Sequence, residues 1–193
     1  MPKATTVLDA VNTIIACVGE TPLNTLDGSL TQDAAIALNT LNEVLREVQS
    51  RGWHFNTFSR TLARDSDGRI PIADNVARID TDMSDHPSLD ITIKGGFAYD
   101  RGEDTDRFDA DIEKATVTVM LEFDEIPEAA KRYVMIRAGR MFADRMVGSE
   151  KHNAFNRSDE MYAWADLRHY ETETGDYSIF GHYDTYRTLD RIR

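Results

Sequence analysis

The chain has 193 residues, enough for one substantial domain or for a domain with a sizeable insertion. Its 41% hydrophobic and 29% charged content is ordinary for a folded globular protein and argues against wholesale disorder. The formal net charge of −12 argues against a simple nucleic-acid binder, which normally displays a basic surface, and the single cysteine excludes an intramolecular disulfide.

The N-terminal segment does not resemble a secretory signal, because Asp9, Asn12 and Thr13 interrupt its apolar positions. No run in the chain approaches the ~18 apolar residues of a membrane helix, so we expect neither export nor contact with a membrane. Cys17 falls on the apolar side of the first predicted helix, and we expect its thiol to be buried and inert.

Two helices are predicted in the first 52 residues. The first covers 5–18, where apolar residues recur at helical spacing before Gly19, and the second runs from the N-cap Thr31 to about Ser50. The second helix carries a stripe with alternating steps of three and four, formed by Ala34, Leu38, Leu41, Leu45 and Val48. A stripe this regular predicts packing against sister helices and suits contact between subunits.

The stretch "QSRGWHFN" predicts a hinge from helix to strand. Gly52 suits the left-handed position after a helix, since it adopts a positive φ without steric cost. Trp53 and Phe55 share a face only if the chain is then extended. We therefore interpret Arg51, Gly52, Trp53 and Phe55 as a structural hinge that pins a new strand onto the preceding helices.

Residues 53–123 predict a β-rich insertion of about four to six short strands. Ile70 and Ile72 alternate with polar residues, and so do the apolar positions of 89–93 and 97–99, which flank the hairpin signal "KGG". The clearest strand is "KATVTVMLEF". Its predicted faces are Val117, Val119, Leu121 and Phe123 on one side and Thr116, Thr118, Met120 and Glu122 on the other.

Helical pattern resumes after the insertion. Pro127 fits the first turn of a third helix that ends near Gly148, and a fourth helix runs from about 150 to 171. The remaining residues are aromatic-rich without periodicity, which favours an arm that docks on another surface, although folding back on its own domain is nearly as plausible. The sequence predicts an α+β protein: an antiparallel helical bundle (1–52 and 125–172), a β-rich insertion (53–124) and an extended C-terminal arm (173–193).

Charge is unevenly distributed along the chain. Residues 100–113 hold seven acids and two Arg, whereas 128–151 hold six bases and three acids. A chain with one acidic and one basic face would suit an assembly subunit whose surfaces meet different partners. The ordinary alternative is charge scattered over the solvated surface.

No catalytic or metal-binding motif is recognised. The five histidines lack the spacing of a zinc helix, and the sequence contains no HExxH, GxSxG, P-loop or GxGxxG motif. Asp104 and Asp106 begin like a calcium loop, but Phe108 occupies its fifth position and no glycine follows at the sixth. We assign no catalytic residue, no metal and no cofactor.

Three stretches resemble a known family: "AVNTIIACVGETPLNTL", "LNEVLREVQSRGWHFN" and "GGFAYDRGEDTDRFD". They are similar to the tail tubular protein A family, the head-to-tail adaptors of short-tailed bacteriophages of the T7 type. The third stretch supplies a family motif loop, formed by Tyr99, Asp100, Arg101, Asp106, Arg107, Phe108 and Asp109. Order and spacing agree through about residue 148.

This resemblance implies a structural virion protein of the short, non-contractile tail, assembled in the host cytoplasm. Such adaptors form a dodecameric ring beneath the portal protein, and the tail nozzle, tail tubular protein B, attaches below. The C-terminal segment reaches toward the portal, which implies a portal-docking interface at Tyr183, Tyr186, Arg187, Arg191 and Arg193. Genomic DNA passes through the channel without specific binding, and no enzyme activity or cofactor is implied.

Two other functions remain open from the sequence. A tail-associated glycan-degrading hydrolase would need two carboxylates across a sugar cleft, and 34 acids always offer some pair. A nucleic-acid-gripping module could use the basic helix at 128–151 and the final arginines, for which solvated tail charge is equally plausible.

Overall fold

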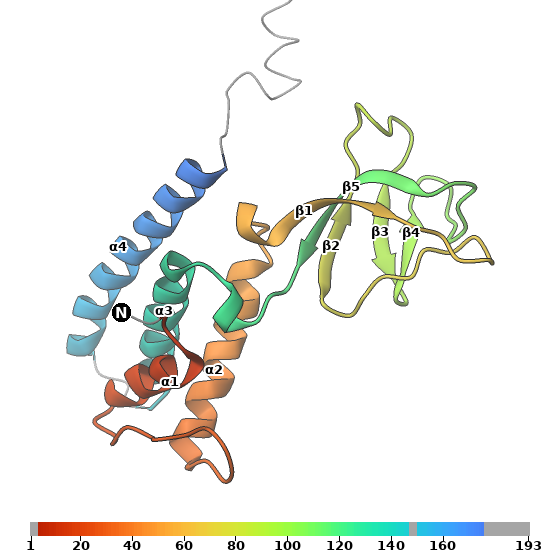
Figure 1. Cartoon of the computed structure of the whole chain (residues 1–193). Coiled ribbons are helices and arrows are strands. Elements are labelled where there is room, and N and C mark those ends of the chain that lie inside the picture. Colours follow the sequence, from red (N-terminus) through yellow and green to blue (C-terminus); the bar gives the residue numbers. More distant parts are fainter. Residues whose placement is uncertain (1–3, 147–149, 176–193) are drawn as a thin grey trace, which may run out of the picture.

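The computed structural model describes residues 4–146 and 150–175, with side chains in the last helix described from 157 onward. This part of the chain contains four helices and two small antiparallel sheets, which confirms the predicted α+β class. Figure 1 shows the helices gathered on one side and the strands standing off on the other. From position 176 onward, the predicted arm lies outside the described residues.

The first helix, α1 (Val7–Ala16), begins at a capping box. The Thr6 hydroxyl accepts from the Asp9 backbone N–H at 3.2 Å, and the Asp9 carboxylate accepts from the Thr6 N–H at 3.0 Å. Each bond satisfies an N–H that the helix itself leaves without a partner. Gly19 follows with a φ of +84°, so the helix ends near the predicted stop.

Helix α2 (Gln32–Gln49) starts at the predicted N-cap, where the Thr31 hydroxyl accepts from the Ala34 N–H. Its apolar stripe packs inside the same chain, because α1 and α3 (Glu128–Met146) lie against α2. Four of its residues are buried, and the fifth, Leu38, is half-buried against the helical core. The expected packing against sister helices is confirmed. The expectation that this stripe serves contact between subunits is wrong, since its own chain already covers it.

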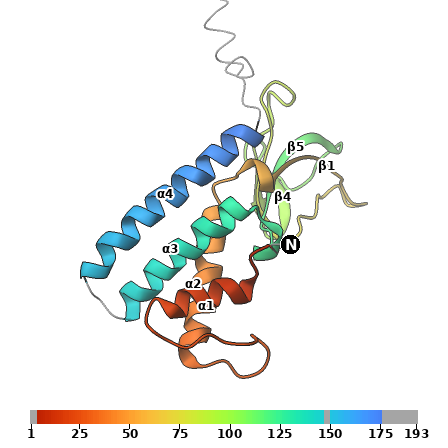
Figure 2. The ribbon, with the colours of Figure 1, turned by 60° about the vertical axis from the view of Figure 1, so that its left-hand side comes forward.

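Helix α4 (Glu150–Thr174) runs back along α3, as Figure 2 shows. It contributes Ala163 and Leu167 to the helical core, both at most 1% exposed. The largest fully buried side chains of that core come from all four helices and from the segment that leads from the β part into α3: Ile14, Leu41, Phe123, Phe142 and Leu167.

Cys17 lies just beyond α1 and is exposed, so the expected burial of this residue is wrong. Its sulfur nevertheless lies over α3 beside Gly139, where an added Cβ would meet it at 3.4 Å. Desolvation raises the pKa of the thiol above its usual value, which favours the protonated and unreactive form.

The β part contains a three-stranded antiparallel sheet and a separate hairpin. The sheet has the order β1 (Thr57–Leu62), β5 (Ile112–Val119), β2 (Val76–Asp80), with β5 in the centre. Strands β3 (Ile91–Lys94) and β4 (Phe97–Asp100) form the hairpin. Gly95 and Gly96 supply the predicted turn with φ of +62° and +82°, as a two-residue hairpin loop of the primed type requires.

A second apolar core lies between these strands and is built around Ile70, Ile79, Ile91, Ile112 and Val117. Two sequence predictions fail here. The strand expected through Phe123 ends at Val119, because Phe123 turns into a short 3-10 helix and joins the helical core. Ile70 is buried as a core residue, but its segment forms only an isolated bridge, from Pro71 to Phe97.

Candidate functional site

The helical core and the β part are joined where α2 ends. Gly52 has a φ of +74°, the left-handed conformation predicted for it. The strand predicted immediately afterwards is wrong, because residues His54–Asn56 form a 3-10 turn and β1 begins at Thr57. The turn is closed by the Asn56 N–H, which donates to the Trp53 carbonyl at 3.1 Å, and by the Trp53 N–H, which donates to Asn56 Oδ1 at 2.8 Å.

An aromatic cluster covers this junction. Trp53 is only 7% exposed, stacks on Phe55 with ring centroids 6.3 Å apart, and donates its indole N–H to the Val48 carbonyl at 2.7 Å. Trp164 of α4 meets Trp53 edge-on with ring centroids 5.4 Å apart, and it meets Tyr133 of α3 in a tilted arrangement at 5.0 Å. Such edge-on geometry places the positive ring edge against a negative face. The junction is therefore packed by α2, α3 and α4 together.

The side-chain amides of Gln49 and Asn56 are buried. They join the segment at the end of α2 to the segment at the end of β5, and we call this pair the amide clamp. Gln49 donates to the Leu121 carbonyl at 2.9 Å and accepts from the Leu121 N–H at 2.8 Å. Asn56 donates to the carbonyls of Gln49 and Val119, both at 3.0 Å. The two side chains are at most 1% exposed, and each forms a hydrogen bond with the backbone of a segment that is distant in the sequence. The clamp therefore fixes both crossings between the two cores.

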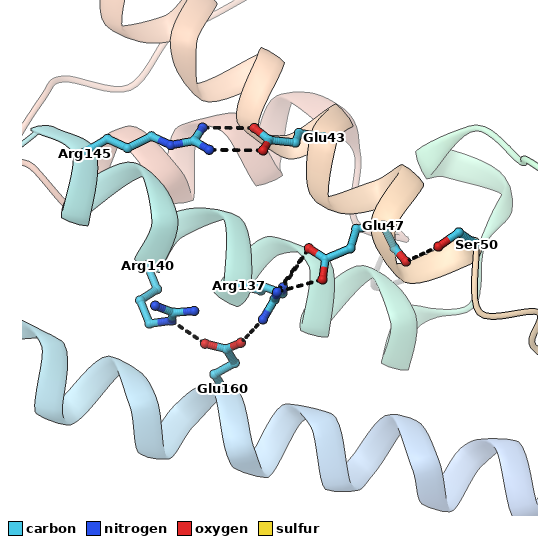
Figure 3. Close-up of polar contacts among 7 residues, drawn as sticks. All are labelled: Glu43, Glu47, Ser50, Arg137, Arg140, Arg145 and Glu160. Carbon is cyan, nitrogen blue, oxygen red and sulfur yellow. Dashed lines mark hydrogen bonds and ion pairs between the residues drawn. The ribbon is translucent and has the colours of Figure 1, made fainter.

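An ion-pair network holds α4 onto the other helices (Figure 3). Glu160 of α4 accepts from Arg137 at 2.7 Å and also from Arg140. Arg137 reaches in the other direction to Glu47 of α2 at 2.8 Å, while Arg145 pairs with Glu43. Glu160 is 13% exposed and Arg137 is 23% exposed, so this pair is shielded from solvent far more than a usual surface pair.

The network shifts the ionisation of its members. Burial raises the pKa of Glu160, but the hydrogen bonds from Arg140 and Arg137 outweigh burial and hold it below its usual value. Burial lowers the pKa of Arg137, while the hydrogen bonds that it donates to Glu160 and Glu47 raise that pKa above its usual value. Both groups are therefore charged at neutral pH, and the pair stabilises the contact between α3 and α4.

Helix α4 also contacts the junction directly. Glu171 accepts from the His54 backbone N–H at 2.7 Å, and the Arg51 guanidinium lies over the Trp164 ring at 4.8 Å. The predicted hinge residues Arg51 and Trp53 thus both contact Trp164 of α4. The junction that carries the β part therefore rests partly on contacts with α4.

A hollow of about 410 Å³ opens beside this contact, and we call it the α3/α4 hollow. Three of its lining residues are arginines and one is a glutamate, a formal charge of +2, and the others are apolar or aromatic. The lining residues are Arg51, Tyr133, Arg140, Arg157, Glu160, Met161 and Trp164. Met161 and its neighbour Tyr162 are 72% and 70% exposed, so α4 presents large apolar groups at its surface.

The family motif loop begins on β4 and mainly shapes its own turn. Asp100 is 5% exposed and accepts from the backbone N–H of Gly102 at 2.8 Å. Tyr99 donates its hydroxyl to Asp104, and the Arg101 N–H donates to the Asp90 carbonyl at 2.8 Å. These contacts assign a structural role to the first half of the motif.

The second half of the motif ties this loop to the 65–69 turn. Arg107 donates to the Asp67 carbonyl at 2.7 Å, and the Phe108 N–H donates to the Gly68 carbonyl at 2.8 Å. Phe108 packs partly against the second core, Asp106 is half-buried and Asp109 is exposed.

The β part carries an acidic end where these two loops meet. A hollow of about 710 Å³ is lined by four acids and one arginine: Asp65, Asp109, Asp111 and Glu113 with Arg64, besides Ser66 and Ala110. The four acids are all exposed. One end of the β part therefore concentrates negative charge that the sequence places in two separate runs.

In the described part of the chain, no three His, Cys, Asp or Glu side chains are grouped so as to hold a metal ion. Within the described ranges, no helix has the length and apolar character that crossing a membrane requires. The predicted docking residues Tyr183, Tyr186, Arg187, Arg191 and Arg193 lie outside the described residues.

Sequence reasoning identified Trp53 and Gly52 but missed Gln49, Asn56, Glu160 and Trp164. Gln49 and Asn56 flank the quoted hinge stretch, yet nothing local marks a polar residue as buried. Glu160 and Trp164 acquire their partners only when α4 packs on α3. In the sequence, the apolar residues Ala163, Trp164 and Leu167 at helical spacing were the available signal for this face of α4.

Comparison with known proteins gives a family for most of the chain. A family model described as "Tail tubular protein" matches residues 8–177, which span both cores and the junction between them. A search of the curated proteins finds no match.

Proposed function

Because the chain belongs to the tail tubular protein family, whose members are structural components of bacteriophage tails, we propose that it is a ring-forming adaptor. It joins the portal of the DNA-filled head to the tail nozzle, and its ring surrounds part of the channel through which DNA is ejected. The observation that carries this proposal is the extent of the family match, which includes the helical part, the β part and the junction.

Each part of the chain has its own role in this proposal. The helical part (1–52 and 125–172) builds the ring, which is dodecameric, and the β part (53–124) stands off it. The arm (173–193) docks on the portal, with Tyr183 and Tyr186 as aromatic anchors and Arg187, Arg191 and Arg193 facing acidic groups. Tail tubular protein B attaches to the opposite side of the ring.

The rigidity of the junction supports a ring. The amide clamp and the aromatic cluster fix the β part relative to the helices through buried contacts. Closed symmetry repeats one angle in every subunit, so slack at the junction would accumulate around the ring.

The charge of the chain supports passage of DNA without binding. Sequence-independent affinity for DNA comes from cations that contact phosphates, and this chain carries a net charge of −12. An acidic channel wall would let DNA slide. The structural nature of the family also argues against an enzyme, and any hydrolase activity would be revealed by turnover of host surface polysaccharide.

The proposal is tested in phage particles that lack the protein. We expect DNA-filled heads that keep the portal but carry no nozzle, and purified protein added to them should restore nozzle attachment. As a control, particles that lack only the nozzle protein should keep this protein on the head. A nozzle attached in the absence of the protein would contradict the adaptor role.

A further inference from the structure

We infer that the α3/α4 hollow of one copy receives the acidic end of the β part of the neighbouring copy. This inference rests on the proposed ring and names the surfaces that close it. It is needed because the apolar stripe of α2, the surface that the sequence favoured for contact between subunits, packs within its own chain.

The hollow has the chemistry of a protein-binding surface with a preference for acids. Arg51 is exposed and is oriented by its position over Trp164, and Arg157 is exposed on α4. Arg140 is oriented by Glu160 and by Asp144 at 3.1 Å. The exposed Met161 and the partly exposed Trp164 add apolar area between these charges. Aromatic, Met and Arg side chains are the residues enriched in the centres of protein interfaces.

The acidic end of the β part is complementary in charge. Its lining carries four acids and one arginine, a formal charge of −3, against +2 for the lining of the hollow. Asp109 and Glu113 are exposed there. Contact between opposite potentials speeds association and fixes the register of two surfaces.

The positions of the two surfaces suit a ring. A closed ring is built from a heterologous contact between two different patches of one chain. Figure 1 shows α4, which supplies part of the lining of the hollow, on one side of α2, and the β part, which carries the acidic end, on the other. Each patch can therefore contact a neighbouring copy without contacting the other patch of its own copy. Because the hollow combines Glu160 and apolar side chains with its arginines, its lining favours a protein partner over a phosphate backbone.

The test uses complementary charge reversals. One variant, R51E/R157E, makes the hollow acidic, and a second, D109R/E113R, makes the end of the β part basic. A matched control, R46E/R132E, makes the same charge change at exposed positions of α2 and α3 outside the hollow. Light scattering measures the protein concentration at which half of the chain is assembled, with the portal present if the wild-type protein needs it.

We expect each reversed variant alone to need at least a tenfold higher concentration for assembly, and the control to behave like the wild-type protein. An equimolar mixture of the two reversed variants should assemble again, because each altered hollow then meets an altered end in an alternating ring. Recovery in the mixture also proves that both variants are folded.

Each other outcome is decisive. If the reversed variants assemble like the wild-type protein, or if their mixture does not recover, the assigned contact is wrong while the adaptor proposal stands. If R51E/R157E assembles normally but loses binding to duplex DNA in a filter assay, the hollow is a phosphate site. If the wild-type protein assembles neither alone nor with the portal, the adaptor proposal itself fails and this contact fails with it.

Discussion

Replacing Asn56 with alanine tests whether the amide clamp holds the two cores together. Asn56 is fully buried, and its side chain makes three hydrogen bonds, to the carbonyls of Gln49 and Val119 and from the N–H of Trp53. The substitution Asn56→Ala removes all three and leaves three buried backbone groups without these partners. The Gln49 carbonyl keeps the bond from the Gly52 N–H at 3.1 Å, so the Val119 carbonyl and the Trp53 N–H bear most of the loss.

The magnitude follows from the number of bonds. A typical intramolecular hydrogen bond contributes roughly 0.5–1.5 kcal/mol net, and a buried group left without a partner costs about 1–3 kcal/mol. Relaxation and water entry offset part of this cost, so we expect Asn56→Ala to lower the free energy of unfolding by about 2–4 kcal/mol.

Urea unfolding followed by tryptophan fluorescence measures this change. Both tryptophans of the chain, Trp53 and Trp164, pack in or against the helical core, so the signal reports the side of the junction that the clamp secures. Asn75→Ala is the matched control. Asn75 is exposed, and the hydrogen bond from the Met120 N–H to its backbone carbonyl does not depend on its side chain. An Asn56→Ala variant within about 0.5 kcal/mol of this control would refute the clamp.

Three further substitutions test neighbouring features of the junction and the helices. Gly52→Ala should destabilise the fold by about 1–2 kcal/mol in urea unfolding, because it forces an L-residue to a φ of +74° with its Cβ 3.3 Å from Thr118 Oγ1; an unchanged midpoint would contradict this. Trp53→Ala should cost about 3–5 kcal/mol as a core truncation, and a double-mutant cycle with Trp164→Ala should return a coupling of about 0.5–1.5 kcal/mol, whereas additivity would mean that the edge-on contact contributes nothing. Folding lowers the pKa of Glu160, so its ionised form stabilises the fold at pH values above the unfolded pKa of 4.5, and this stabilisation is lost as the pH falls below that value. The difference in the free energy of unfolding between the wild-type protein and Glu160→Gln should therefore shrink on titration from pH 7 into the acid range. A difference independent of pH would exclude the charge effect.

Local features of the fold were predictable because their causes are local. Thr31 caps α2 through its own hydroxyl, and Gly95 and Gly96 turn the β3–β4 hairpin because glycine adopts positive φ. The apolar stripe of α2 was also identified correctly as a packing surface. Periodicity shows that a face is covered, however, and does not show whether the cover comes from the same chain.

The junction was less predictable because its contacts join distant residues. Gln49 and Leu121 are 72 residues apart, and Glu160 pairs with Arg137 across two helices. Buried polar residues give no periodic signal, since each depends on a partner that only the tertiary fold supplies. The 3-10 turn after Gly52 depends likewise on the Asn56 side chain, so sequence reasoning expected a strand there.

The mass of the purified protein in solution, measured by light scattering alone and with a portal preparation, tests the adaptor proposal most directly. We predict a closed ring, free or on the portal, whose mass corresponds to twelve chains of 21.9 kDa. A ring that forms only with the portal would assign the arm a role in assembly. A chain that stays monomeric at 21.9 kDa and ignores the portal would contradict the adaptor role.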